Sequence, residues 1–332
     1  MPTLLDPLKV KGLILQNRIV MPPMATELAT ENGEVTDQLV KHYVDRCEKV
    51  GLIIVEHSYV SKEGKLSPRQ LGIYDDKLIE GLARLAREIK KHGAIAAIQI
   101  NHAGGKASSK ITGLKPIAPS SIIVPGGAEE PSEMTLADIE RVQEAFEKAA
   151  IRAIKAGFDA VEIHGAHGFL LNQFLSPITN KRLDAYGGTL EKRMRFPLEI
   201  VERIRETIGD HLLLYRLGAD DMTPGGLTIE ESKKFAVKLE KTGVDIIDVS
   251  GGLCGSRPEK LTTQGYFVPL AEKIKSVVDI PVIGVGGIKD PQFADKVVRE
   301  GKVDLVAIGR AMLADPKWAL KAVKKLRKIE KH

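Results

Sequence analysis

The stretch TLADIERVQEAFEKAAIRAIKAGFDAVEIH, residues 135–164, holds one helix-and-strand unit and shows how the rest of the chain is built. Its first part spaces apolar residues three and four apart, begins on a threonine suited to a helix N-cap, and ends at Gly157, suited to a helix C-terminus. Its second part, 159–164, is a short apolar run typical of a buried strand. We therefore expect a helix followed by a strand.

The same alternation recurs along the whole chain without a long linker. Strand-like runs cover 18–24, 52–58, 94–100, 159–164, 212–217, 245–250, 281–287 and 304–309, and the clearest helical patterns cover 76–93, 135–157, 189–209, 228–243 and 290–301. Strands that are apolar on both faces and alternate with helices form a parallel sheet, and eight such units close into a barrel. We predict an α/β fold, a (β/α)8 TIM barrel, as a single domain over 1–332 with a short basic helix at about 315–332.

A doubly wound open sheet is the alternative fold. It would be expected to carry a G-x-G-x-x-G motif after its first strand. In this chain MPPMATELATENG (21–33) stands there instead, and its prolines do not fit that motif. The barrel is therefore favoured.

Composition narrows the classes of protein. The chain has 332 residues, of which 43% are hydrophobic and 28% charged, as in globular proteins. It contains no long apolar run and no signal-peptide pattern, and Cys47 and Cys254 are too few for a disulfide framework, so we expect a cytoplasmic protein. The net charge of +5 has one basic cluster, KKLRKIEKH (324–332), which lacks interleaved aromatic residues. We expect a solvated helix end there, with no nucleic-acid and no membrane partner.

A barrel of this type places its active site at the C-terminal ends of its strands. The last two strand-like runs lead into GVGGIKD (284–290) and AIGRAML (307–313). Glycines let backbone N–H groups approach an anion, and an arginine can bind a phosphate in a bidentate manner. These loops predict a phosphate site, with simple tight turns as the alternative; its residues are Gly286, Gly287, Gly309 and Arg310.

Two polar residues lie within otherwise apolar strands. Gln99 offers a donor and an acceptor, as the edge of an imide requires. Arg216 needs an anionic partner, which could be Glu162 on the neighbouring strand or a cofactor that becomes negative on reduction. Together with a phosphate site, these two side chains suit flavin mononucleotide (FMN).

Two histidines three residues apart end the fourth strand-like run, in VEIHGAHGFLLNQFLSP (161–177). One alternative is a zinc site completed by Glu162 or His102, and another is a pair of histidines that only pack. A third is a pair of N–H donors above a flavin, which would hold a carbonyl, carboxylate or nitro oxygen while negative charge grows on it. We favour the third, with His164 and His167 as catalytic and substrate-binding residues and no metal.

The chain resembles the Old Yellow Enzyme family of FMN-dependent NADH:flavin oxidoreductases over nearly its whole length. The matching blocks are NRIVMPPM (17–24), GLIIVE (51–56), QINHAGGK (99–106), DAVEIHGAHGFLLNQFLSPITNKRLDAYGGTLEKRMRF (159–196), GVGGI (284–288) and DLVAIGRAMLADP (304–316). The resemblance implies an FMN-binding barrel that NADH or NADPH reduces and that passes hydride to the β-carbon of an activated alkene (an enone, enoate or nitroalkene). It also implies flavin contacts at Pro23, Met24, Ala25, Gln99 and Arg216, and an activating group held by His164 and His167.

Within the family, MPPMAT and HGAHGF are most similar to the branch of 2-enoate and 2,4-dienoyl-CoA reductases. Those relatives continue into a Cys-rich iron–sulfur segment, whereas this chain has no C-x-x-C motif. We expect a stand-alone barrel that takes electrons from NAD(P)H or from an electron-donor protein, and a homo-oligomer, as is usual in the family.

There are two departures from the family pattern. Phe169, expected in the substrate site, stands where many relatives carry a tyrosine that donates a proton to the substrate α-carbon. That proton would come instead from water or from Tyr59, Tyr266 or Glu27, or the preferred reaction needs no donor there. Ala25 stands where many relatives carry Cys or Thr, so we expect a different flavin potential.

Two other functions fit parts of the pattern. A flavin barrel could act as an oxidative dehydrogenase or as the electron-transfer subunit of a larger complex. A phosphate-binding aldolase or isomerase would use no flavin, but it would usually need an inward lysine or a carboxylate base. None of the eight strand-like runs contains a lysine, which disfavours this class.

Overall fold

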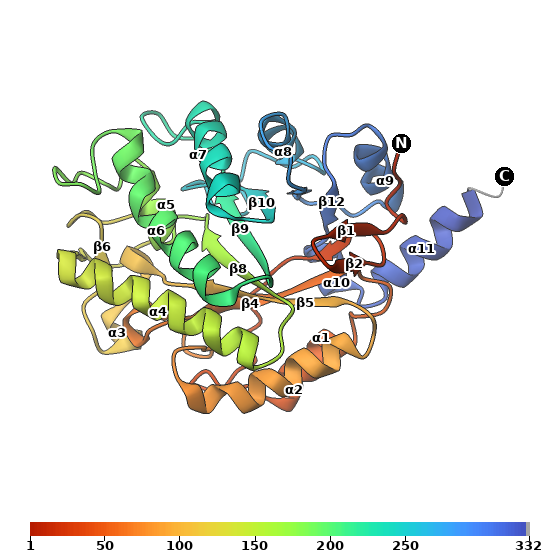
Figure 1. Ribbon diagram of the computed structural model, residues 1–332, viewed down its shortest axis with the longest axis horizontal. Helices are drawn as coiled ribbons and strands as arrows, with labels where there is room; N and C mark the ends of the chain where they lie inside the picture. The colour runs from red at the N-terminus through yellow and green to blue at the C-terminus, as the bar shows by residue number, and fades with distance from the viewer. Residues whose placement is uncertain (330–332) are drawn as a thin grey trace.

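The computed structural model, which describes residues 1–329, is a closed barrel of eight parallel strands surrounded by helices (Figure 1). The strands follow one another around the barrel in chain order, and each predicted run overlaps one of them, with ends that differ by a few residues. They are β3 (Ile19–Met21), β4 (Leu52–Tyr59), β5 (Ile95–Asn101), β8 (Ala160–Gly165), β9 (Leu212–Gly218), β10 (Ile246–Ser250), β11 (Val282–Gly284) and β12 (Leu305–Ala307). The predicted (β/α)8 barrel is confirmed.

Each of the five predicted helical patterns contains a helix of the outer layer. Two further helices, α1 and α8, were not predicted. The helices of this layer are α1 (Asp37–Val44), α2 (Ile79–Lys90), α4 (Leu136–Lys155), α6 (Leu190–Ile208), α7 (Ile229–Thr242), α8 (Val268–Lys275) and α9 (Pro291–Arg299). Thr135 and Thr228 begin α4 and α7 with reciprocal capping boxes, which satisfy backbone N–H groups that a helix start leaves free. Each helix turns a buried apolar face toward the barrel.

A hairpin of β1 (Leu8–Val10) and β2 (Leu13–Leu15) closes one end of the barrel. Val10 and Leu15 pack in the same apolar cluster as Leu52 and Leu212, which are the first residues of their strands. The N-terminal end of the barrel is therefore filled, and the strands open at their C-terminal ends. Sequence analysis did not find this hairpin, because strands of three residues carry little periodicity.

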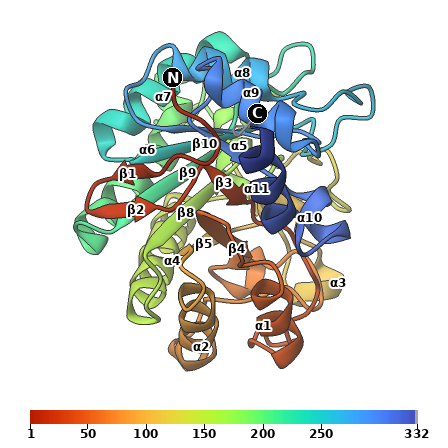
Figure 2. The ribbon, with the colours of Figure 1, turned by 90° about the vertical axis from the view of Figure 1, so that its right-hand side faces the viewer.

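Short elements connect the layers and cover the C-terminal ends of the strands. They are η1 (Lys62–Gly64), η2 (Asp76–Leu78), η3 (Gly104–Lys106), α3 (Ser109–Thr112), β6 (Ile117–Ala118), β7 (Ser132–Glu133), α5 (Leu170–Leu175) and α10 (Arg310–Ala314). Helix α11 (Trp318–Ile329) lies in the basic segment, and residues 330–332 of the helix expected there fall outside the described residues. It lies on the same side as the β1–β2 hairpin, the side that faces the viewer in Figure 2.

No helix among the described residues is both long enough and apolar enough to cross a membrane.

Several polar residues in the segment between β8 and α6 have a structural role. Arg182 is buried and donates to the backbone carbonyl oxygens of Pro119 and Met134, at 3.1 Å and 2.6 Å, while it pairs with Asp184. The amide of Asn180 donates to two further carbonyl oxygens in the same region. Buried carbonyl groups of irregular backbone need such partners, so these residues hold the loop in shape.

We expect Arg182→Met to lower the free energy of unfolding by about 1–3 kcal/mol, because it leaves buried carbonyl oxygens without donors. The matched control is Arg195→Met on α6, whose half-exposed side chain pairs with Glu199; that change should cost less than about 1 kcal/mol. Urea unfolding followed by circular dichroism measures both. Equal losses for the two variants would contradict the role given to Arg182.

Candidate active site

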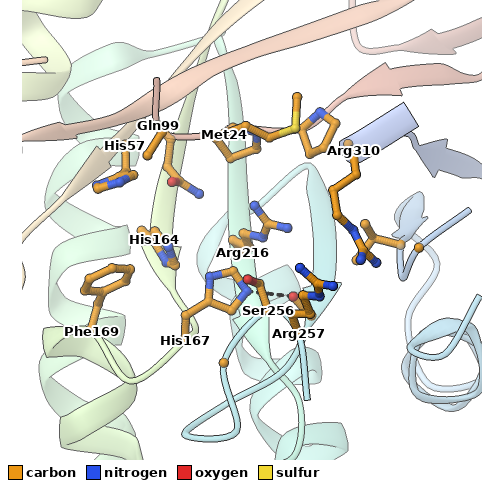
Figure 3. A pocket seen from close by; sticks show the side chains of 18 of the residues that line it. Met24, His57, Gln99, His164, His167, Phe169, Arg216, Ser256, Arg257 and Arg310 are labelled. Carbon is orange, nitrogen blue, oxygen red and sulfur yellow. Dashed lines mark hydrogen bonds between the residues drawn. The ribbon is translucent and has the colours of Figure 1, made fainter. Parts of the chain in front are cut away.

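A cavity of about 470 Å³ lies at the C-terminal ends of the barrel strands (Figure 3). The structure brings nearly all the predicted site residues into its lining: Pro23, Met24, Ala25, Gln99, His164, His167, Phe169, Arg216, Gly287, Gly309 and Arg310. Gly286 is next to this lining but not in it. Residues from all around the barrel thus meet in one place, as parallel strands that end at the same rim require.

The cavity has a cationic end formed by the loops after β11 and β12. Gly287 has a φ of +62°, and a Cβ atom there would stand 2.8 Å from Nη2 of Arg310. Glycine therefore leaves room for the guanidinium, which donates to the hydroxyl oxygen of Tyr266 at 3.3 Å. Gly286, with a φ of +129°, allows a similarly close approach to the backbone of Tyr266. The geometry leaves room for an anion beside Arg310.

Four buried polar side chains from consecutive strands lie at the floor of the cavity. The amide nitrogen of Gln99 donates to a carboxylate oxygen of Glu162 at 2.8 Å. The partner of Arg216 is Asp248, at 3.2 Å, so the suggestion that Glu162 neutralises this arginine is wrong. The reason is register: Arg216 lies directly opposite Asp248 on β10, whereas Glu162 lies opposite Leu214, two residues lower.

The charges of this floor are tightly coupled. Burial, with the nearby Asp248 as a second cause, holds the pKa of Glu162 well above its usual value. Burial also raises the pKa of Asp248, against the opposing effect of Arg216. Glu162 is thus stabilised as the neutral acid, and Asp248 is the carboxylate that pairs with Arg216.

The paired histidines lie beside this floor, His164 near the end of β8 and His167 on the loop that follows the strand (Figure 3). Nδ1 of His164 accepts from the backbone N–H of Ala166 at 3.2 Å, so its proton is on Nε2. Nε2 of His167 is 2.7 Å from the hydroxyl of Ser250, and its backbone φ of +57° is unusual for a residue with a side chain. Burial lowers both pKa values well below their usual value, so both rings are uncharged near neutral pH and each carries one N–H.

Phe169 packs beside the pair, with its ring centroid 4.7 Å from that of His164. Of the three side chains suggested as proton donors in its place, Tyr266 lines the cavity. Tyr59 is stacked on Tyr74, and Glu27 accepts hydrogen bonds from the loop at 67–69, so neither reaches the lining.

Sequence reasoning missed several residues of the site: His57, Lys106, Asp248, Ser250, Ser256 and Arg257. His57 and Ser250 stand at or near the ends of predicted strands, so the rule that chemistry gathers at strand ends could have found them. The loop at 255–257 has no strand pattern and gave no signal. The zinc alternative would need Glu162 or His102 as a ligand beside the paired histidines. Glu162 is hydrogen-bonded to Gln99 instead, and His102 is outside the cavity lining.

Fold and lining together define a class: a (β/α)8 barrel whose cavity has an arginine and glycines at one end and neutral histidines at the other. The family model described as the NADH:flavin oxidoreductase / NADH oxidase family matches residues 3–329. The chain therefore belongs to this family, the Old Yellow Enzyme family, and is an oxidoreductase that uses a flavin and a nicotinamide nucleotide.

Individual relatives agree with this assignment. The chain is 46% identical to an NADH oxidase of Thermoanaerobacter brockii over 97% of its own length, but it spans half the length of that relative. It is 43% identical to an NADPH dehydrogenase of Geobacillus sp. (strain WCH70), covering 97% of this chain and 94% of the relative. The structure of an old yellow enzyme homologue from Zymomonas mobilis superimposes with a TM-score of 0.87 at 28% identity, over 98% of this chain and 93% of that one.

Stability should depend on pH through the buried imidazoles. Burial lowers the pKa of His57 and of His102 to about 4, from a usual value of 6.5. The unfolded chain therefore binds protons at these groups before the folded chain does, so their contribution is fully present above about pH 6.5 and is lost as the pH falls toward about 4. We expect the thermal unfolding midpoint to rise with pH through this window, with a shallower slope for His57→Phe. An identical slope would show that His57 titrates alike in both states.

Proposed function

We propose that this protein is an FMN-dependent ene-reductase: NAD(P)H reduces the flavin, which transfers hydride to the β-carbon of a small activated alkene. The observation that carries the proposal is the position of two neutral histidine N–H donors in the same lining as Gln99 and Arg216. Such donors stabilise the negative charge that grows on a carbonyl, carboxylate or nitro oxygen when hydride adds to the alkene.

The lining fits FMN. Arg310, beside a glycine that a Cβ would crowd, suits the phosphate. Gln99 and Arg216 suit the polar edge of the ring, and Pro23, Met24 and Ala25 provide further contacts. When bound, FMN supplies the hydride chemistry that no amino-acid side chain offers.

The chain's own residues bind and orient the substrate alkene. His164 and His167 hold the activating group and withdraw charge from the alkene. Both rings are neutral near neutral pH, so they donate hydrogen bonds without transferring a proton. Phe169 and the walls of the cavity exclude water from one side. Phe169 has no hydroxyl, and the hydroxyl of Tyr266 lies at the cationic end, where it donates to the carbonyl oxygen of Ser256 at 2.9 Å and accepts from Arg310. The proton for the α-carbon therefore comes from water.

Four further features complete the proposal. The domain assignment is one FMN-binding barrel over 1–332. The compartment is the cytoplasm, which agrees with two cysteines that form no disulfide. The assembly is a homo-oligomer, and reduction comes from NAD(P)H directly or from an electron-donor protein.

The central test uses purified protein loaded with FMN. NADPH or NADH should bleach the flavin without oxygen, and 2-cyclohexenone should restore its colour. Replacing both His164 and His167 by alanine should keep FMN bound but lower kcat/KM for 2-cyclohexenone by about a hundredfold, because two oxyanion donors are lost. The exposed His92→Ala is the matched control. Protein that takes up no FMN, or a double variant with full activity, would refute the proposal.

The phosphate assignment has its own test, with riboflavin as the matched ligand. Arg310→Met should weaken FMN binding about tenfold, since one charge-assisted hydrogen bond is lost. Riboflavin has no phosphate, so its affinity should stay within about twofold. Fluorescence titration of the apoprotein measures both constants. A similar loss for the two ligands would mean that Arg310 shapes the ring site instead.

A further inference from the structure

A third histidine faces the cavity beside the known pair. His57 is on β4 and is 8% exposed; its ring centroid is 6.4 Å from that of His164 and 5.6 Å from that of Phe169. Figure 3 shows it on the same side of the cavity as the two other imidazoles and the phenyl ring, away from the cationic end. The function proposed above gives this residue no role.

The hydrogen bonds of His57 determine where its proton lies. The side-chain oxygen of Gln70 accepts from the backbone N–H of Leu66 at 2.7 Å, so its NH2 group faces His57. That NH2 group is 2.8 Å from Nδ1 of His57, which must therefore accept. In the neutral ring the proton is then on Nε2. His57 itself lines the cavity, and its ring is bonded to described residues through Nδ1 alone, which leaves the N–H of Nε2 for a ligand there.

The charge of the lining points to what this donor binds. The described residues that line the cavity include four cations, Lys106, Arg216, Arg257 and Arg310, and no Asp or Glu. Arg216 has Asp248 beneath it, and Arg310 is at the phosphate end.

Lys106 differs from these cations. Its Nζ donates to the backbone carbonyl oxygen of His167 at 2.7 Å and lies 5.3 Å from the centroid of the Phe169 ring, and it forms no ion pair with any described residue. A half-buried ammonium group without a carboxylate is stabilised by an anionic ligand.

The oxygen of a ketone or aldehyde has two lone pairs, which His164 and His167 suffice to fill. A carboxylate has two oxygens with about four acceptor sites and a negative charge. Of these two groups, only the carboxylate can use a third N–H donor and a cation in addition to the pair.

We propose that His57 is a third N–H donor to the substrate and that, with Lys106, it makes this cavity select alkenes bearing a carboxylate over alkenes activated by a single carbonyl oxygen. This inference rests on the proposed function, because it concerns the same cavity above a bound flavin. His57 is here a specificity-determining residue, and the hydride and proton steps are unchanged.

The test compares the affinities of two ligands that share a ring, 1-cyclohexenecarboxylate and 2-cyclohexenone. Each is titrated into the oxidised FMN-loaded enzyme, and its dissociation constant is read from the perturbed flavin absorbance, so turnover plays no part. His57→Phe keeps a ring against Phe169 but removes the N–H. It should weaken the carboxylate about tenfold, as loss of one hydrogen bond to a charged group does, and change cyclohexenone by less than about threefold.

Controls separate the local effect from a general loss of structure. His42→Phe, on α1 outside the cavity, should change neither constant. Lys106→Met should also weaken the carboxylate more than the ketone, whereas Lys110→Met on the exposed helix α3 should not.

Two results would overturn the inference while leaving the proposed function intact: an unchanged carboxylate affinity in His57→Phe, or an equal loss for both ligands. A wild-type enzyme that holds FMN but binds neither ligand would contradict the proposed function, and this inference with it. A protonation map by ¹⁵N NMR of the imidazoles gives a second readout. A hydrogen on Nδ1 of His57, with none on Nε2, would overturn the donor role.

Discussion

Closure of the barrel is the constraint on which the rest of the structure depends. The last strand, β12, pairs with the first barrel strand, β3, and the amide groups of Val306 and Ile308 donate to the carbonyl oxygens of Arg18 and Val20, both at 2.9 Å. This pairing leaves no free sheet edge and brings all eight strand ends to one rim. Residues separated by nearly the whole chain, such as Met24 and Arg310, line one cavity for this reason.

The two ends of the closed barrel differ in polarity. The N-terminal end is sealed by the hairpin that carries Val10 and Leu15, and its interior is apolar. Toward the other end the interior becomes polar, with Gln99, Glu162, Arg216 and Asp248 buried together. Burying these groups is costly, and the pairs they form offset only part of that cost. Polar groups held in this way are suited to meet the polar edge of a cofactor.

The cavity combines neutral imidazole donors with cationic side chains. Burial keeps His57, His164 and His167 uncharged near neutral pH, so they donate hydrogen bonds without adding charge. Net positive charge comes from Lys106 and the arginines. Under the proposed function, Arg310 holds the phosphate at one end of the cavity and the neutral imidazoles polarise a substrate oxygen at the other.

Much of this was accessible from the sequence. The alternation of strand-like and helical runs was enough for the barrel. Strand-end reasoning found Gln99, His164, His167, Arg216 and Arg310, whereas Pro23, Met24, Ala25 and Phe169 came from the family resemblance. Short elements such as the β1–β2 hairpin escaped because a few residues carry no readable period.

By itself, the sequence determined the fold class and the kinds of side chain at each strand end, since these follow from local periodicity and position along a strand. Only the tertiary structure decided which of them are partners. The register between β9 and β10 makes Asp248 the ion-pair partner of Arg216. The loop at 66–70 orients Gln70, which determines which ring nitrogen of His57 carries the proton. Such pairings depend on contacts between distant segments, which no local pattern encodes.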